Sequence, residues 1–190
     1  MEVAFCAFDG MTALDFVGAY DPVTRLDRMD FLALDWDVCA RTDRAETSDL
    51  TLGVDRVNPD LGAYDVVFVP GGYATRELRH DEAFLAWLEP AADAEYLASV
   101  CTGSLLLGAA GLLDGRQATT HPQAYDLLAE YAEVVEDRVV RDGDVITGRG
   151  VSSSLDLGLY LVEELAGAGA REAIAEGMDY PYGEEVFSGA

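Results

Sequence analysis

The sequence predicts a single α/β domain built on a mostly parallel central sheet. Short apolar runs typical of buried strands alternate along the 190 residues with longer helix-periodic segments, and no long linker separates them. Because 50% of the residues are hydrophobic, a chain of this length can bury a substantial core. With no internal repeat and no low-complexity tract, we expect residues 1–190 to form one unit.

Apolar, β-branched runs predict the strands of the first half of the sheet. These runs cover residues 2–8, 31–39 and 64–69, with 50–54 as a short extension. The first run ends at the turn Asp9-Gly10, and the third stops at the breaker cluster Pro70-Gly71-Gly72. Helical periodicity marks residues 81–91 and residues 14–23, the latter either closing at Asp21-Pro22 or running on past it.

The second half of the chain continues the same alternation. Strand patterns cover residues 95–100, 117–120, 134–140 and 144–147, and helix patterns cover 105–113, 122–131 and 155–166. Asp142-Gly143 is a strong hairpin signal between the last two strands. We expect the last dozen residues to form an irregular tail, which either lies over the site or forms a subunit contact.

The most informative segment is Val100-Cys101-Thr102-Gly103, where a predicted strand becomes a helix. A side chain at such a corner projects above the sheet edge from a sharp turn, which is the geometry of a nucleophile elbow with cysteine in place of serine. The unpaired N–H groups and the dipole of the following helix favour the thiolate, the reactive form of cysteine. The alternative is a buried structural cysteine, since free cysteine is among the most buried residue types.

Other strand ends bring polar groups to the same edge, where open α/β sheets bind their ligands. Asp15 is either a first-turn helix charge or a proton carrier beside the sulfur, with a pKa raised by burial and by the neighbouring thiolate. Gly71 and Gly72 form either a plain tight turn or an oxyanion site, in which the Gly72 and Thr102 N–H groups donate. The Thr102 hydroxyl makes either a helix first-turn bond or a bond to substrate.

Two further residues complete the predicted binding surface. His121 closes the strand over residues 117–120 and could reach the same edge, although a lone histidine is more often a hydrogen-bonded structural residue. Gly103, directly after the elbow, belongs to the backbone expected to lie against substrate. The three cysteines are widely spaced, which argues against a disulfide framework and against a zinc site.

Charge excludes one class of partner. The chain has 36 acidic and 12 basic residues, a net charge of −24, so its surface repels the phosphates of nucleic acids. Such an excess is typical of proteins from a salt-rich cytoplasm, where dissolved ions screen the repulsion between the protein's own acidic groups. The alternative is an ordinary acidic protein from a low-salt organism. No apolar run approaches the ~20 residues that span a bilayer, and the start lacks a signal-peptide pattern. We therefore predict a cytoplasmic protein without nucleic-acid or membrane partners.

These motifs together resemble the ThiJ/PfpI superfamily, whose members are similar to class I glutamine amidotransferases. The resemblance covers nearly the whole chain and is carried by Asp9-Gly10, Asp15, Val69-Pro70-Gly71-Gly72, Val100-Cys101-Thr102-Gly103, residues 110–115, Ala118-Thr119-Thr120-His121 and residues 146–150. It implies a flavodoxin-like three-layer sandwich with an elbow cysteine. It also implies a homodimer.

The branch with the best match is isonitrile hydratase-like, with an aspartate in the opening loop and Cys-Thr-Gly at the elbow. Asp15, Cys101 and Thr102 hold those places, and the ending Asp179-Tyr180-Pro181-Tyr182 also looks similar. Protease-like members place histidine after the cysteine and an acid just beyond the Gly-Gly. Here Thr102 and Arg76 stand there, which argues against a peptidase triad.

This branch implies a cofactor-independent lyase that converts a small isonitrile and water to an N-substituted formamide. Cys101 is then the nucleophile, Asp15 carries the proton and Thr102 positions substrate or water. The segment Thr120-His121-Pro122 instead resembles the corresponding segment of a glyoxalase and deglycase branch, whose members act on α-oxoaldehydes. A third possibility is a redox sensor that uses an oxidisable Cys101 without turnover.

Overall fold

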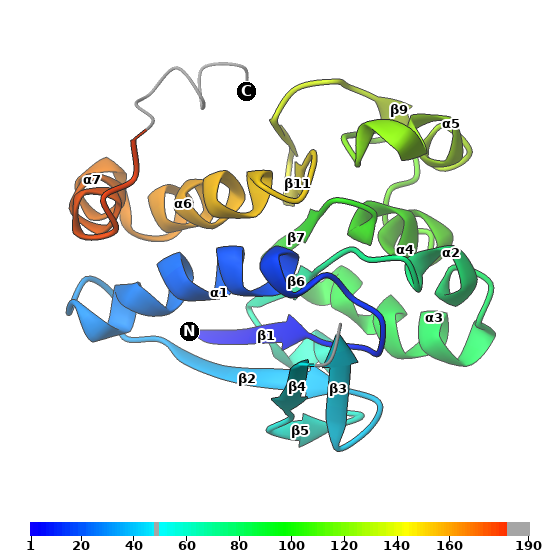
Figure 1. The fold of residues 1–190 in the computed structure, drawn as a ribbon, viewed down its shortest axis with the longest axis horizontal. Helices are drawn as coiled ribbons and strands as arrows, with labels where there is room; N and C mark the ends of the chain where they lie inside the picture. The colour runs from blue at the N-terminus through cyan, green and yellow to red at the C-terminus, as the bar shows by residue number, and fades with distance from the viewer. Residues whose placement is uncertain (48–49, 182–190) are drawn as a thin grey trace.

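The protein is described by a computed structural model over residues 1–47 and 50–181. The strands of its main sheet are β1 (Glu2–Cys6), β2 (Asp35–Ala40), β5 (Arg56–Val57), β6 (Val66–Val69), β7 (Tyr96–Val100), β10 (Val139–Asp142) and β11 (Val145–Gly148). They lie in the order β10-β11-β7-β6-β1-β2-β5, and β10 alone is antiparallel to its neighbour (Figure 1). This is the predicted, mostly parallel sheet.

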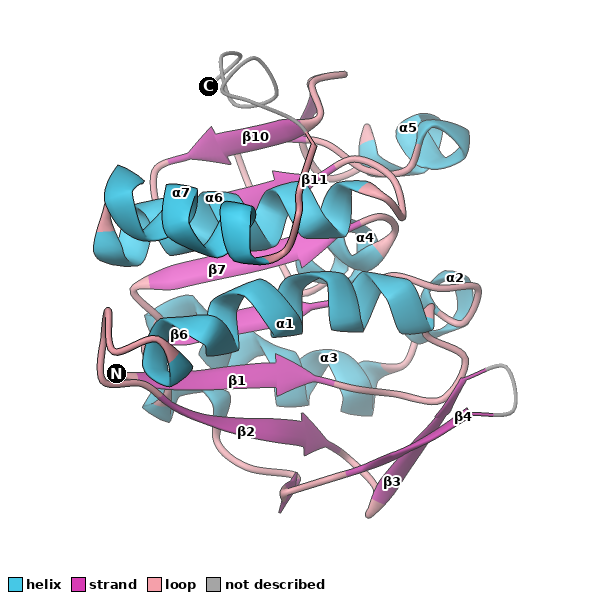
Figure 2. Cartoon of the chain, turned by 60° about the vertical axis from the view of Figure 1, so that its left-hand side comes forward, coloured by secondary structure: helices cyan, strands magenta, loops and turns pink. Residues whose placement is uncertain are grey.

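Helices cover both faces of this sheet (Figure 2). One face carries α1 (Ala13–Arg28), α6 (Ser153–Ala166) and α7 (Ala168–Gly177), and the other carries α3 (Glu82–Leu88) and α4 (Gly103–Ala109). The short helices α2 (Thr75–Leu78) and α5 (Tyr125–Leu128) lie near the carboxyl ends of the strands. Because both faces are covered, every residue of β6 is buried, and the predicted three-layer sandwich is confirmed.

Two small sheets differ from the predictions. The strands β3 (Arg44–Thr47) and β4 (Leu50–Gly53) form an antiparallel pair, while β8 (Gln117–Ala118) pairs with β9 (Glu133–Val134). The interpretation of residues 50–54 as an extension of the second strand was therefore wrong. The predicted strand 134–140 divides into β9 and β10, and α7 was not predicted. Within the described ranges 1–47 and 50–181, no helix combines the length and apolarity needed to cross a membrane.

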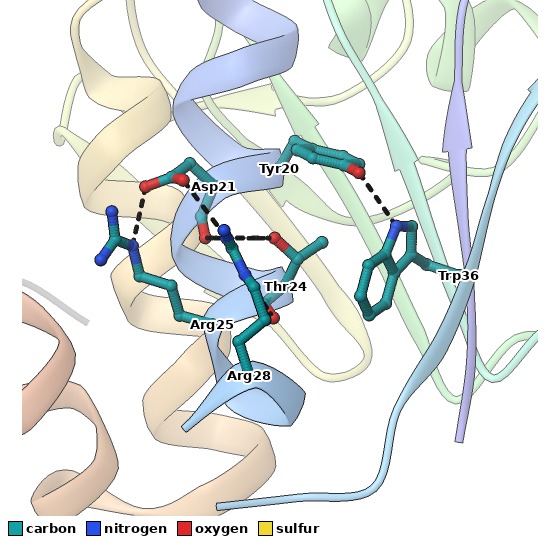
Figure 3. Close-up of polar contacts among 6 residues, drawn as sticks. All are labelled: Tyr20, Asp21, Thr24, Arg25, Arg28 and Trp36. Carbon is teal, nitrogen blue, oxygen red and sulfur yellow. Dashed lines mark hydrogen bonds and ion pairs between the residues drawn. The ribbon is translucent and has the colours of Figure 1, made fainter. Parts of the chain in front are cut away.

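Helix α1 runs on past Pro22 to Arg28, which settles the alternative that the sequence left open. An interior proline removes a backbone donor and usually costs about 3 kcal/mol. Polar contacts on the same turns help to hold the helix: Asp21 Oδ2 accepts from Arg25 Nε at 2.8 Å, and Arg28 Nη2 donates to Thr24 Oγ1 at 2.7 Å (Figure 3). The helix is also tied to β2, because Trp36 Nε1 donates to Tyr20 Oη at 3.0 Å.

Glycines allow α1 and α6 to cross closely. A methyl group at Gly158 would lie 2.5 Å from Pro22 Cγ and 3.0 Å from Ala19 Cα, and one at Gly18 would overlap the side chain of Ser154. The Ser154 hydroxyl donates to the Leu14 carbonyl at 3.0 Å. The crossing therefore holds the first turn of α1, which carries Asp15.

Substitution of Gly158 by valine is expected to lower the free energy of unfolding by about 1–3 kcal/mol, because the backbone of α1 must move to admit the side chain. Chemical denaturation measures the change. Gly169→Ala in α7 is the control, since a methyl group there meets nothing within 4 Å and alanine favours a helix. An unchanged denaturation midpoint in Gly158→Val would contradict the close crossing.

Tyr180, close to the last residue that the structure describes, contacts helix α6. The Tyr180 hydroxyl donates to one carboxylate oxygen of the buried Asp156, and Arg138 pairs with the other at 2.5 Å. Tyr180 belongs to the last dozen residues, which were predicted to form an irregular tail, but residues 182–190 of that tail lie outside the described residues.

Candidate active site

The loops that follow β1, β6 and β7 meet at one edge of the sheet, because these strands are adjacent and parallel. The chain crosses from one side of β1 to the other between β2 and β6, so the strand order reverses beside β1 and β6. The Thr12 N–H donates to the Gly71 carbonyl at 2.8 Å, and Met11 forms a β-bridge with Gly72. The loop after β1 is thus joined directly to the loop after β6.

Cys101 occupies the predicted corner between β7 and α4. Its φ angle is 55°, in the left-handed region that only a few non-glycine residues adopt. The turn is held on both sides, since the Cys101 N–H donates to the Gly148 carbonyl at 3.0 Å and its carbonyl accepts from Thr120 Oγ1 at 2.8 Å. The residue is 6% exposed and lines a pocket, so it is largely but not completely buried.

Asp15 lies against this sulfur from the first turn of α1 and is wholly buried. Its Oδ2 accepts a hydrogen bond from the Gly71 N–H at 3.0 Å. Its Oδ1 is buried without a hydrogen bond of standard geometry to any described residue, and the carboxyl interacts with the Cys101 thiol. The structure therefore brings together the two residues predicted to carry out the chemistry.

Gly71 lies between the acid and the thiol. A methyl group at this position would lie 2.9 Å from Asp15 Oδ2, 2.9 Å from Cys101 Cβ and 2.6 Å from the Thr102 nitrogen. Two of these contacts involve groups that are fixed by the backbone, so neither can move away cheaply. The absence of a side chain at Gly71 is what lets the carboxyl approach the sulfur.

Burial dominates the ionisation of the pair. It raises the pKa of Asp15 to about 7, although the hydrogen bonds with Cys101 and Gly71 act in the opposite direction. Burial, and after it the negative charge of Asp15, raises the pKa of Cys101 to about 12, against the hydrogen bond from the Thr102 N–H. The N–H group at the start of the helix acts in the predicted direction, but burial and the Asp15 charge outweigh it, so the thiol is the favoured form in the free protein. Near neutral pH a thiol faces a partly ionised carboxyl.

The Asp15→Asn variant is expected to be more stable than the wild type at pH 8, by roughly 2–4 kcal/mol. Folding raises the pKa of Asp15 from 3.8 to about 7, so between these values the folded chain binds more protons and stability falls as the pH rises. Denaturation at several pH values measures this, and the advantage should shrink as the pH falls toward 5. Asp114→Asn, at an exposed position, is the control. A pH-independent difference would contradict the raised pKa.

The Gly72 N–H, one of the two groups predicted to bind an oxyanion, is already occupied. The Gly72 N–H donates to Thr102 Oγ1 at 3.0 Å, and that hydroxyl donates to the Gly72 carbonyl at 3.0 Å. The Gly71 N–H is used by Asp15. The predicted donation of the Gly72 N–H to an oxyanion is therefore wrong for this geometry, and the Thr102 hydroxyl is hydrogen-bonded to the loop after β6. The Thr102 N–H still faces the sulfur.

A small pocket of about 100 Å³ opens above the thiol. It is lined by Thr12, Gly72, Tyr73, Arg76, Cys101, Thr102, His121, Gln123 and Val151. His121 Nδ1 accepts from the Gln123 N–H at 3.2 Å, which holds the ring on the pocket wall. Gly103 does not line the pocket: a methyl group there would overlap the Val69 carbonyl oxygen, so this glycine lets α4 start against the end of β6.

Comparison with known proteins assigns the family. Residues 1–164 match the DJ-1/PfpI family. The chain belongs to the DJ-1/PfpI family. It is 36% identical to the isonitrile hydratase of Pseudomonas putida over 192 residues, which cover 100% of this chain and 83% of that protein. It is 39% identical to the Parkinson disease protein 7 homolog of Danio rerio over 111 residues, 56% of this chain and 59% of that protein.

Solved structures of DJ-1/PfpI proteins have the same fold. A THiJ/PfpI family protein from Pseudomonas syringae superimposes with a TM-score of 0.87 at 32% identity, covering 100% of this chain and 78% of that one. Drosophila melanogaster DJ-1beta superimposes with a TM-score of 0.81 at 23% identity, over 95% of this chain and 98% of that one. The ThiJ/PfpI resemblance and the flavodoxin-like fold predicted from the sequence are confirmed.

Sequence reasoning missed much of the pocket wall of this DJ-1/PfpI protein. Thr12, Tyr73, Gln123 and Val151 lie on loops and short turns without a motif that marks them. Arg76 did carry a signal, because it stands where protease-like members of the superfamily have an acid. In the described part of the chain, no group of His, Cys, Asp and Glu side chains is arranged to hold a metal ion.

Proposed function

We propose that this protein is a cofactor-independent isonitrile hydratase, which converts R–N≡C and water to an N-substituted formamide. The observation that carries the proposal is the contact between a buried carboxyl and a thiol below a small pocket. Identity of 36% to an isonitrile hydratase over the whole chain supports it. A base with a pKa near the working pH is well matched to proton transfer, and Asp15 has that property.

In the first half of the reaction, the Asp15 carboxylate takes the thiol proton as Cys101 Sγ bonds to the terminal carbon of the isonitrile. Asp15 then gives that proton to the same carbon, which leaves a thioimidate, R–N=CH–S–Cys101. The Thr102 N–H hydrogen-bonds to the sulfur and favours its anionic form as the proton leaves.

In the second half, Asp15 takes a proton from water as the water oxygen bonds to the thioimidate carbon, and Asp15 returns that proton to the nitrogen. The carbon–sulfur bond of the resulting adduct then breaks. The hydroxyl proton of the adduct passes through Asp15 to the sulfur, which releases R–NH–CHO. The thiol and the carboxylate are restored, so each turnover consumes one isonitrile and one water.

Incubation with a small alkyl isonitrile tests the proposal, with the formyl proton of the product followed by NMR. We expect formamide well above the uncatalysed rate, and one ¹⁸O atom in the product when the water is labelled. Formation of no formamide above that rate would end the proposal. Methylglyoxal serves as the second substrate in the same assay, because a thiol beside a base could also add to an α-oxoaldehyde.

The ionisation of the site favours turnover over oxidation sensing. Peroxides oxidise the thiolate, so redox-sensing cysteines have a lowered pKa and are accessible to solvent. Cys101 has a raised pKa, so little of it is thiolate at pH 7. Titration with hydrogen peroxide, read by mass spectrometry, checks this: we expect oxidation of Cys101 to be slow at pH 7.

A further inference from the structure

Two arginines of this acidic chain have no carboxylate partner among residues 1–47 and 50–181. All 12 basic residues are arginines, against 36 acidic residues. Ten of them form ion pairs within 4.0 Å. Arg76 and Arg149 form none with the residues that the structure describes. The guanidinium groups of these two arginines are therefore not neutralised by any carboxylate of the described residues, which leaves them available to an anionic ligand.

One of these two arginines, Arg76, lines the pocket of the candidate active site, and each of the two faces a tyrosine ring. The Arg76 guanidinium carbon lies 5.6 Å from the centre of the Tyr73 ring, and that of Arg149 lies 5.9 Å from the centre of the Tyr125 ring. They differ in access. Arg76 and Tyr73 line the pocket above Cys101, whereas Arg149 does not line it and its Nε is buried.

The position of Arg76 suits anion recognition. Contact with an aromatic face leaves the in-plane N–H groups of a guanidinium available, and these match the two oxygens of a carboxylate. Arg76 is half-buried in α2, and its neighbour Glu77 forms no ion pair with it. Without a local cation, the partly ionised Asp15 and the net charge of −24 would repel an anion from this pocket.

We propose that Arg76 binds a carboxylate of the substrate, so that the pocket selects small anionic electrophiles. The proposal rests on the proposed function for the type of substrate. It adds that the preferred isonitriles carry a carboxylate. Arg76 acts by binding and orienting, since the pocket places it on the wall and the thiol beneath.

Alkylation of Cys101 tests the proposal without any isonitrile. Iodoacetate and iodoacetamide have the same reactive carbon, and one carries a carboxylate where the other carries a neutral amide. In both reactions the sulfur bonds to carbon, iodide leaves and the thiol proton passes to Asp15. The ratio of the two rates, followed by mass spectrometry of the Cys101 peptide at fixed ionic strength, cancels changes in the reactivity of the sulfur itself.

We expect Arg76→Gln to lower the iodoacetate-to-iodoacetamide ratio by about tenfold or more, and Arg76→Lys to lower it less, because lysine keeps the charge but loses the paired geometry. Arg44→Gln removes the same charge from the β3–β4 pair, outside the pocket, and should leave the ratio unchanged. An equal ratio in wild type and Arg76→Gln would overturn the proposal.

A second measurement separates this proposal from the hydratase assignment. The kcat/KM for isocyanoacetate, divided by that for its methyl ester, should fall in Arg76→Gln by a factor similar to that of the alkylation ratio. If neither isonitrile is converted but the alkylation ratio still falls, anion recognition stands and the hydratase assignment fails. If both are converted with the same preference in wild type and variant, the reverse holds.

Discussion

Replacement of Cys101 by alanine is expected to reduce isonitrile hydration by roughly 10⁴-fold or more, because Cys101 supplies the only thiol among the described residues that line the pocket. Turnover is measured as formamide produced per enzyme, with the fold checked by circular dichroism. Serine at this position should also be inactive, since its alkoxide is much harder to form than a thiolate beside the same carboxyl.

The matched control for this prediction is Cys39→Ala. Cys39 is also a buried free thiol, but it lies in β2 and contacts the Tyr64 hydroxyl at 3.5 Å, away from the pocket. Its loss should leave the turnover number near that of the wild type. Full activity in Cys101→Ala would show that the reaction does not pass through a sulfur adduct.

Replacement of Asp15 by asparagine is expected to reduce kcat/KM by roughly 10²–10⁴-fold, because asparagine cannot carry a proton between the sulfur, the carbon and water. The fold should survive, since an amide oxygen can still accept from the Gly71 N–H. The same substitution that stabilises the protein at high pH therefore removes its activity.

The pH profile sharpens this prediction. As the active form of Asp15 is the carboxylate, the wild-type kcat/KM should rise with pH and level off above about 7, near the pKa of that group. The residual activity of Asp15→Asn should lack this rise, whereas Asp114→Asn should keep it. A wild-type profile that is flat between pH 5 and pH 8 would contradict the role of Asp15 as the base.

The meeting of Asp15, Gly71 and Cys101 at one edge was predictable because the carboxyl ends of adjacent parallel strands share that edge. Strand-terminating glycines and the cysteine at a strand-to-helix corner mark these loops in the sequence alone. The hairpin of β3 and β4 was harder to predict, because a short antiparallel pair away from the main sheet shows the same alternation as an edge strand.

The chemical state of the site was not predictable from the sequence. The pKa of Cys101 depends on how far burial and the Asp15 charge outweigh the Thr102 N–H, and burial is a property of the packed structure. Likewise, no sequence pattern shows that the Gly72 N–H is already taken by Thr102. Such contacts link residues far apart in the chain, so they follow from the complete fold.

The left-handed backbone at Cys101 has an evolutionary consequence. Glycine adopts this conformation without steric cost, so it is the residue that fits this turn best. Glycine has no side chain, however, and therefore can do no chemistry there. Under the proposed function, selection for catalysis and selection for an unstrained turn therefore oppose each other at this one position. A relative with glycine at the equivalent position should fold stably but have no activity. The residue at this position therefore offers a simple criterion for separating active from inactive members of the family.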